Sequence, residues 1–141
     1  MDRILIGIDP DVDKNGVAFI YKDVIDLLNL NFFELFDYLK IAKSKPKELL
    51  VVVEAGWLNK SNWHTNKKGS AALNAKIGNN TGRNHEVGRK IIEMLEYLGV
   101  QYKLVKPKTS KINSKMFHRI TGIKKSNQEQ RDSYMLIHGL K

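Results

Sequence analysis

The sequence predicts an α/β protein in which a mixed central sheet is flanked by helices. Two short runs, residues 4–8 and residues 49–53, are apolar almost throughout. Runs of this length indicate strands that are buried on both faces. Apolar residues elsewhere recur at helical spacing, both between these two strands and after them. The length of 141 residues suits one core, so we expect a single domain over residues 1–141.

Three consecutive strands are expected in the N-terminal part. Residues 16–21 are apolar and follow the first strand after a short gap, so the two strands are expected to form an antiparallel hairpin. Residues 24–28 add a third strand, which makes a meander.

A helix is expected over residues 31–43, where apolar residues form one wide face. Asn31 is a suitable N-cap, and Glu34 follows three residues later in the capping-box pattern. A helix in this place is the usual connection between parallel strands. The strands at residues 4–8 and 49–53 are therefore expected to be parallel neighbours.

The C-terminal half predicts three further helices and one strand. Helices are expected over residues 84–98, 111–120 and 128–140, and a strand over residues 100–105. The second of these helices is short and basic.

Residues 55–82 show no clear period and predict a long loop, which inside a compact domain is usually functional or disordered. Aromatic rings among lysines suit base stacking combined with phosphate contacts. For Trp57, a place in the core is an equally good interpretation. The DNA-binding candidates of this segment are Trp57, Lys60, Trp63, Lys67 and Lys68.

Charge is distributed unevenly along the chain, whose net charge is +9. Residues 1–54 carry 7 basic and 10 acidic side chains, whereas residues 55–141 carry 17 basic and 5 acidic ones. Such segregation points to a polyanionic partner, most simply a nucleic acid. The alternative is a lysine-rich solvated surface, which explains less well that two tracts, residues 55–85 and residues 97–128, contain no acidic residue.

The chain has no cysteine, which excludes disulfides, thiolate zinc sites and a cysteine nucleophile. The sequence has no apolar run long enough to span a membrane and no apolar leader after Met1. We therefore expect a cytoplasmic protein without a membrane partner.

A carboxylate follows each of the two buried strands. Asp9 comes directly after the first strand and Glu54 directly after the second. Parallel neighbours would bring both to the same edge of the sheet, where ligands bind in such proteins. Taken singly, Asp9 before Pro10 could open a turn, and Glu54 could face solvent.

Two more carboxylates, Glu129 and Asp132, lie three residues apart and share one face of the last expected helix. Stabilisation of the helix dipole is the alternative role for both. If all four carboxylates converge, their repulsion demands a cation, and oxygen ligands suit Mg²⁺ or Mn²⁺. Together with a basic surface, such a cluster indicates phosphodiester hydrolysis, in which two metal ions clamp the attacking and leaving oxygens.

The order of these elements resembles the RuvC family of Holliday junction resolvases, within the ribonuclease H-like fold. Three motifs carry the resemblance: Ile6-Gly7-Ile8-Asp9-Pro10 followed by Gly16-Val17-Ala18, then Val51-Val52-Val53-Glu54, and Glu129-x-x-Asp132 followed by Ser133-Tyr134-Met135-Leu136. Two positions depart from the family. Asp11 stands where glycine is usual, and Glu129 stands where aspartate is more frequent.

The resemblance implies a crossover junction endodeoxyribonuclease with the ribonuclease H-like fold. It implies a homodimer that nicks two strands of a branched DNA symmetrically, with residues 84–98 near the dimer interface. Asp9 would bridge two Mg²⁺ or Mn²⁺ ions, and Glu54, Asp132 and Glu129 would complete their coordination. The products would carry a 5′-phosphate and a 3′-hydroxyl.

Further candidates for contacts with the DNA backbone lie in the second acid-free tract. Such contacts position a protein on DNA without reading its sequence. These candidates are Lys106, Lys108, Lys111 and Lys115.

Three other functions are alternatives, and the sequence leaves the first of them open. Another ribonuclease H-like nuclease could cut an RNA–DNA hybrid or flap DNA. An ATPase of the sugar-kinase or actin type has a similar first motif but needs two such domains. A junction-binding protein without activity would gain nothing from acids that face phosphate.

Overall fold

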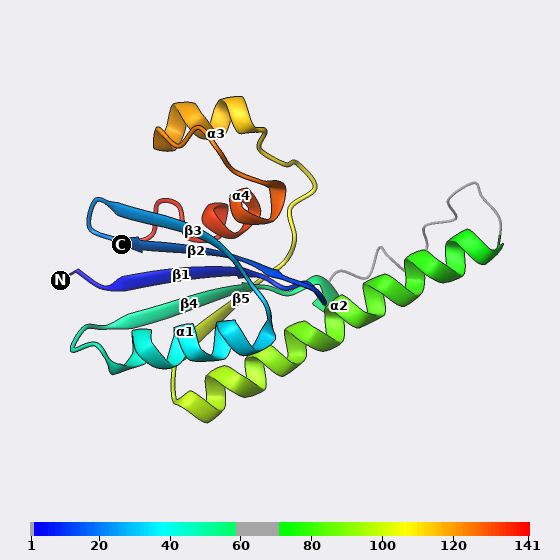
Figure 1. Ribbon diagram of the computed structural model, residues 1–141, viewed down its shortest axis with the longest axis horizontal. Helices are drawn as coiled ribbons and strands as arrows, with labels where there is room; N and C mark the ends of the chain where they lie inside the picture. The colour runs from blue at the N-terminus through cyan, green and yellow to red at the C-terminus, as the bar shows by residue number, and fades with distance from the viewer. Residues whose placement is uncertain (1, 59–70) are drawn as a thin grey trace.

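The computed structural model describes residues 2–58 and 71–141, without the side chains of residues 71–78 and 80. In this part of the chain, one sheet with the strand order β3-β2-β1-β4-β5 is sandwiched between helices (Figure 1). The elements are β1 (Ile4–Asp9), β2 (Asn15–Tyr21), β3 (Val24–Leu30), α1 (Phe32–Ser44), β4 (Leu49–Glu54), the 3₁₀ turn η1 (Gly56–Leu58), α2 (Ala71–Leu98), β5 (Gln101–Val105), α3 (Ser114–Thr121) and α4 (Gln128–Met135).

The sheet is mixed, as the sequence predicts. Strands β1, β2 and β3 form an antiparallel meander, whereas β4 pairs with β1 in parallel and β5 pairs with β4 in parallel. The β1–β4 register runs from Ile4 opposite Leu49 to Ile8 opposite Val53. The next residue of each strand is a carboxylate, so this register confirms the expectation that both strands end at the same edge.

Both faces of the sheet are covered, and this explains why β1 and β4 are apolar without alternation. On one face, Ile6 and Val51 pack with side chains of α1 and α2. On the other face, Leu5 and Val52 pack with side chains of α3 and α4, among them Phe117. Full burial of such side chains stabilises a fold by about 1.5–3 kcal/mol each.

Helix α4 lies directly on the sheet because two glycines leave room for its backbone. A methyl group at Gly7 of β1 would collide with the carbonyl of Ser133, and one at Gly16 of β2 would collide with the carbonyl of Glu129. Neither of these glycines has a positive φ angle. Glycine is needed here because it has no side chain. This close approach sets the height of α4 above the ends of β1 and β4.

The helix ends follow the capping chemistry of the sequence. Asn31 and Glu34 form the expected capping box at the start of α1. Asn113 caps α3, and Asn127 forms a second capping box with Gln130 at the start of α4. Helix α3 therefore begins later than expected, and regular α-helix in α4 ends at Met135, earlier than expected.

The expectation of a loop over residues 55–82 is wrong in part. Helix α2 begins at Ala71 and has 28 residues, whereas the periodic pattern predicts only residues 84–98. The N-terminal half of α2 extends beyond the sheet (Figure 1). A helical segment without a core to cover needs no apolar stripe, so hydrophobic periodicity does not reveal it.

We expect Gly16→Ala to destabilise the protein by about 1–3 kcal/mol, the usual cost of inserting atoms where there is no space. Urea denaturation would measure the free energy of unfolding. Gly82→Ala is the matched control, because nothing lies within 4 Å of an added methyl group on this helical residue. The control should be neutral or stabilising by up to about 1 kcal/mol. Equal stability of both variants would contradict the role of Gly16.

Candidate active site

Three carboxylates from distant parts of the chain meet at one edge of the sheet. Asp9 ends β1, Glu54 ends β4 in the neighbouring position, and Asp132 lies on α4. Each offers one oxygen, and these oxygens all lie within 4.8 Å of one another. The side chains of Glu54 and Asp132 are only 10% and 12% exposed. The cluster is therefore a recessed group of oxygen ligands.

The fourth predicted carboxylate, Glu129, does not belong to this group. It lies in the first turn of α4, is exposed, and its backbone rests over Gly16. Its place near the start of the helix also suits the helix dipole, which was the alternative expected for it.

Burial makes the cluster electrostatically unfavourable without a cation. The pKa of Asp9 is raised to about 8, chiefly by burial and further by the charge of Glu54, a hydrogen bond with Glu54 and the charge of Asp132. Lys111 opposes this shift. Carboxylates so close together cannot all be ionised without a positive partner. Three oxygen donors fit a hard divalent cation such as Mg²⁺ or Mn²⁺.

Lys111 lies against the carboxylates. Its ammonium nitrogen is 3.1 Å from Asp132 Oδ2 and 3.8 Å from Glu54 Oε1. Partial burial alone would lower the pKa of Lys111, but its hydrogen bond to Asp132 and the charges of Glu54, Asp132 and Asp9 outweigh burial and raise it. The sequence predicts a contact with the DNA backbone for this residue, whereas the structure brings it into the acidic cluster.

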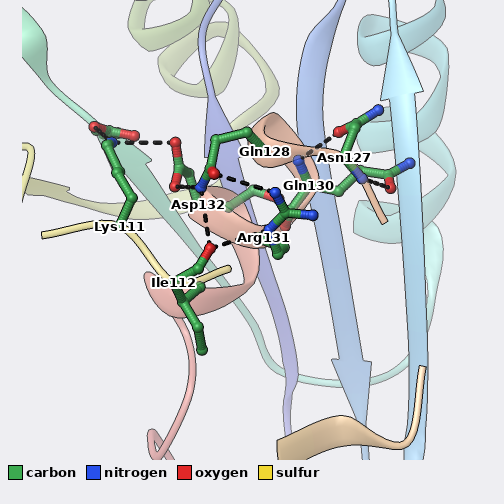
Figure 2. A network of polar contacts seen from close by, with 9 residues as sticks. Lys111, Ile112, Asn127, Gln128, Gln130, Arg131 and Asp132 are labelled. Carbon is green, nitrogen blue, oxygen red and sulfur yellow. Dashed lines mark hydrogen bonds and ion pairs between the residues drawn. The ribbon is translucent and has the colours of Figure 1, made fainter. Parts of the chain in front are cut away.

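Both oxygens of Asp132 are held by hydrogen bonds (Figure 2). Lys111 donates to Oδ2, and the Gln128 side-chain amide donates to Oδ1 over 2.8 Å. Sequence reasoning missed Gln128, although its spacing of four residues from Asp132 on an expected helix was an available signal. Arg131 was missed as well. Its partners are Gln128 on α4, Ser126 before α4 and Ile112 in the segment before α3, and of these only Gln128 lies at a helical spacing.

A cavity of about 410 Å³ opens beside the cluster, between the segment after β5 and the end of α4. Glu54 and Asp132 line its inner part, and Lys106 and Lys108 line it as well. The fourth predicted lysine of this tract, Lys115, is exposed on α3 and does not line the cavity. The cavity therefore joins basic side chains to the recessed carboxylates.

Trp57 belongs to η1 and is partly buried against α2. Its ring lies over Gly88, where a methyl group would collide with it, and it meets His85 edge-on at 6.5 Å between ring centroids. The Arg89 guanidinium lies 5.8 Å from the Trp57 ring. Trp57 and His85 share a smaller cavity of about 160 Å³ with Asp9. The ring packs against a helix and also borders the site, and a contact of Trp57 with DNA stays a prediction.

The remaining predicted DNA-binding residues lie outside the described residues. These are Lys60, Trp63, Lys67 and Lys68. None of the helices in the described part of the chain is long and apolar enough to cross a membrane.

The mixed sheet, with carboxylates at the ends of two parallel neighbours and on a later helix, has the ribonuclease H-like fold. The structure of RuvC from Thermus thermophilus is similar, with a TM-score of 0.52 and 12% sequence identity over 94% of this chain and 90% of that chain. A second structure, of T. thermophilus RuvC in complex with Holliday junction substrate, aligns over 95% of this chain and 89% of that chain, with a TM-score of 0.46 and 14% identity. No protein-family model and no curated protein matches the sequence. The chain therefore shares the fold of the RuvC Holliday junction resolvases, as the motifs predict.

We expect the metal-free protein to lose stability as the pH rises from about 4 to about 8. The folded pKa of Asp9 lies above the ordinary value of 3.8, so the folded state binds more protons than the unfolded state in this window. Asp9→Asn removes this penalty and should stabilise the protein at pH 8 in EDTA by about 1 kcal/mol or more, since one pKa unit corresponds to about 1.4 kcal/mol.

Urea denaturation at pH 5 and pH 8 would measure this difference. Asp37→Asn, at an exposed position of α1, controls for the loss of one negative charge. Addition of Mg²⁺ should stabilise the wild-type protein and not the Asp9→Asn variant, because ligand binding to the folded state alone raises stability. If Asp9→Asn were less stable than the wild type in EDTA at pH 8, repulsion among the buried carboxylates would not be what destabilises the metal-free protein.

Proposed function

We propose that the protein is a metal-dependent endonuclease that resolves branched DNA, with the Holliday junction as its substrate. The observation that carries this proposal is the group of Asp9, Glu54 and Asp132, whose oxygens converge at the sheet edge. The likeness in fold to RuvC supports the class of reaction. The excess of basic residues after residue 54 supports a nucleic acid as the partner.

Asp9, Glu54 and Asp132 would hold Mg²⁺ or Mn²⁺, two ions in each active site, and Glu129 is the additional candidate ligand. When bound, the ions supply the activation of a water molecule and the stabilisation of charge on the phosphate. Asp9 is the central ligand in this proposal, because its carboxylate interacts with those of both Glu54 and Asp132. Cleavage would leave a 5′-phosphate and a 3′-hydroxyl.

The lysines around the cluster have different parts in this proposal. Lys111 neutralises Asp132 and Glu54 in the metal-free protein. When these carboxylates bind cations, the Lys111 ammonium becomes available for an oxygen of the scissile phosphate. Lys106 and Lys108 line the adjoining cavity and would contact neighbouring phosphates, while Lys115 would contact the DNA farther away.

A second active site is needed to resolve a four-way junction by paired nicks. We propose a homodimer for this reason, with the segment of α2 from residue 84 to residue 98 near the interface. Such a reaction belongs to DNA recombination and DNA repair.

A cleavage assay tests the substrate. Synthetic four-way junction, flap DNA, linear duplex and an RNA–DNA hybrid would be incubated with the protein in Mg²⁺ or in EDTA. Paired symmetric nicks on the junction, lost in EDTA, are expected. Cutting of the hybrid or the flap alone would show that the junction is not the substrate, but it would still support the proposed metal site. Tight junction binding without any cutting would indicate a binding protein and refute the proposed activity.

We expect Asp9→Asn to abolish cleavage while junction binding persists. The change keeps the shape of the side chain but removes the charge of the proposed central ligand. The loss of rate should exceed about 100-fold, which is the upper range for changing a residue that only supports a metal ligand. Single-turnover cleavage and a gel-shift titration would measure rate and affinity separately. Cleavage by this variant at the wild-type rate would show that Asp9 is not part of the site.

We expect Lys106→Ala combined with Lys108→Ala to weaken junction binding and to flatten its salt dependence. Each lost phosphate contact should reduce the slope of log K against log salt by about 1. Lys40→Ala is the matched control, because Lys40 is exposed on α1, on the other face of the sheet from α4. An unchanged slope in the double variant would exclude these two lysines as phosphate contacts.

A further inference from the structure

Arg131 precedes Asp132 on α4 and donates hydrogen bonds in three directions. Figure 2 shows those to Ile112 and Gln128. Arg131 Nε donates to the carbonyl of Ile112 over 3.1 Å, and its Nη2 donates to Gln128 Oε1 over 3.1 Å. Its Nη1 donates to the carbonyl of Ser126 over 2.8 Å and to Ser126 Oγ over 3.0 Å. All of these acceptors are neutral oxygens, so this guanidinium organises other groups instead of neutralising an acid.

The first chain of contacts runs through Gln128 to Asp132. Because Gln128 Oε1 accepts from Arg131, the amide nitrogen of Gln128 faces the other way. That nitrogen donates to Asp132 Oδ1 over 2.8 Å. A side-chain amide can turn over and exchange its donor and acceptor ends. Arg131 therefore selects the orientation in which Gln128 presents a donor to the carboxylate.

The second chain of contacts runs through the segment between β5 and α3. Arg131 holds the carbonyl of Ile112, and Lys111 is the preceding residue. The Lys111 ammonium donates to the other oxygen of Asp132, Oδ2, over 3.1 Å. Residues 106–113 form no helix or strand, so a fixed carbonyl within this segment restricts where Lys111 can lie. Each oxygen of Asp132 thus accepts a hydrogen bond from a side chain that Arg131 helps to place. Arg131 contacts Gln128 directly and acts on Lys111 through the carbonyl of the next residue, Ile112.

We propose that Arg131 is a positioning residue that acts through Gln128 and through the segment carrying Lys111 to aim the Asp132 carboxylate at Asp9 and Glu54. The inference rests on the proposed nuclease function, because the reaction it serves is metal-dependent cleavage. Only arginine offers several donors in a rigid planar fork, and a lysine at this position would reach the three groups of acceptors poorly.

A contact with DNA is the competing role for a basic residue here. The guanidinium is partly buried and its Nε, Nη1 and Nη2 atoms already donate within the chain. A phosphate would have to replace these partners. The positioning role therefore predicts a loss of rate with little loss of affinity, whereas a phosphate contact predicts a loss of affinity.

The first experiment compares Arg131→Met, Arg131→Lys and the control Arg119→Met in the full chain. Arg119 is exposed on α3, so its replacement removes one positive charge from the same basic half of the protein. Arg131→Met should lower the single-turnover cleavage rate by about 10–100-fold, the usual effect of losing a group that supports a metal ligand. It should raise the Mn²⁺ concentration needed for half-maximal rate and leave the junction Kd within about twofold. Arg131→Lys should recover only part of the rate, and Arg119→Met should cut at the wild-type rate.

A double-variant cycle separates positioning from a general loss of stability. Gln128→Ala removes the contacts that run through the amide, including its long 3.5 Å hydrogen bond to the carbonyl of Ile112, but it leaves the shorter bond from Arg131 to that carbonyl. It should therefore lower the rate less than Arg131→Met does. The double variant should be about as slow as Arg131→Met alone, because residues that act through one another are not additive. If the rate loss of the double variant equalled the product of the two single rate losses, the proposal would be overturned. A wild-type rate in Arg131→Met, or a fall in junction affinity that accounts for its rate, would overturn it as well.

Calorimetric titration with Mn²⁺ alone separates this inference from the proposed function. If the wild type cuts no DNA, the proposed function fails, yet weaker Mn²⁺ binding in Arg131→Met than in Arg119→Met would still support the positioning role. Equal Mn²⁺ binding in both variants would overturn the inference whether or not the wild type cuts. Thermal unfolding checks that the variants are folded. Should Arg131→Met not fold, Gln128→Ala decides: weakened Mn²⁺ binding supports the proposal, and unchanged binding overturns it.

Discussion

The candidate site depends on how closely α4 approaches the sheet. Strands β1 and β4 bring only Asp9 and Glu54 together, and the third carboxylate arrives because Gly7 and Gly16 let the backbone of α4 rest on β1 and β2. The fold thereby holds like charges together against their repulsion, as the raised pKa of Asp9 reflects. Stability is given up at this edge, where the three carboxylates could hold a cation. Loss of stability at a site of this kind is a frequent compromise in proteins.

The cluster is surrounded by groups that fix its geometry without neutralising it fully. Lys111 is the cation that contacts Asp132 and Glu54 directly, while Gln128 contributes a neutral donor. Arg131 keeps its charge one step away from the carboxylates. A permanent ion pair between a guanidinium and Asp132 would compete with metal binding, so holding the aspartate through an amide keeps that oxygen in place and still able to coordinate an ion.

The features predicted from the sequence are those set by local patterns. Continuous apolar runs revealed β1 and β4, and the intervening helix indicated their parallel pairing, which brings Asp9 beside Glu54. The N-terminal half of α2 extends beyond the sheet, and its sequence lacks the apolar periodicity by which residues 84–98 were predicted to be helical. The distance of Glu129 from the cluster and the contact of Lys111 with it depend on the exact docking of α4 and of an irregular segment. Side-chain spacing along the chain does not encode either.

The assembly of the site from residues far apart in the chain also bears on protein synthesis. Domains are made from the N-terminus onward, and β1 and β4 leave the ribosome long before α4. Until α4 docks, the nascent chain has two of its three clustered carboxylates and lacks the groups that orient the third. In the proposed nuclease, cation binding and DNA cleavage would thus be withheld from incomplete chains, so the protein would not become active before it is folded.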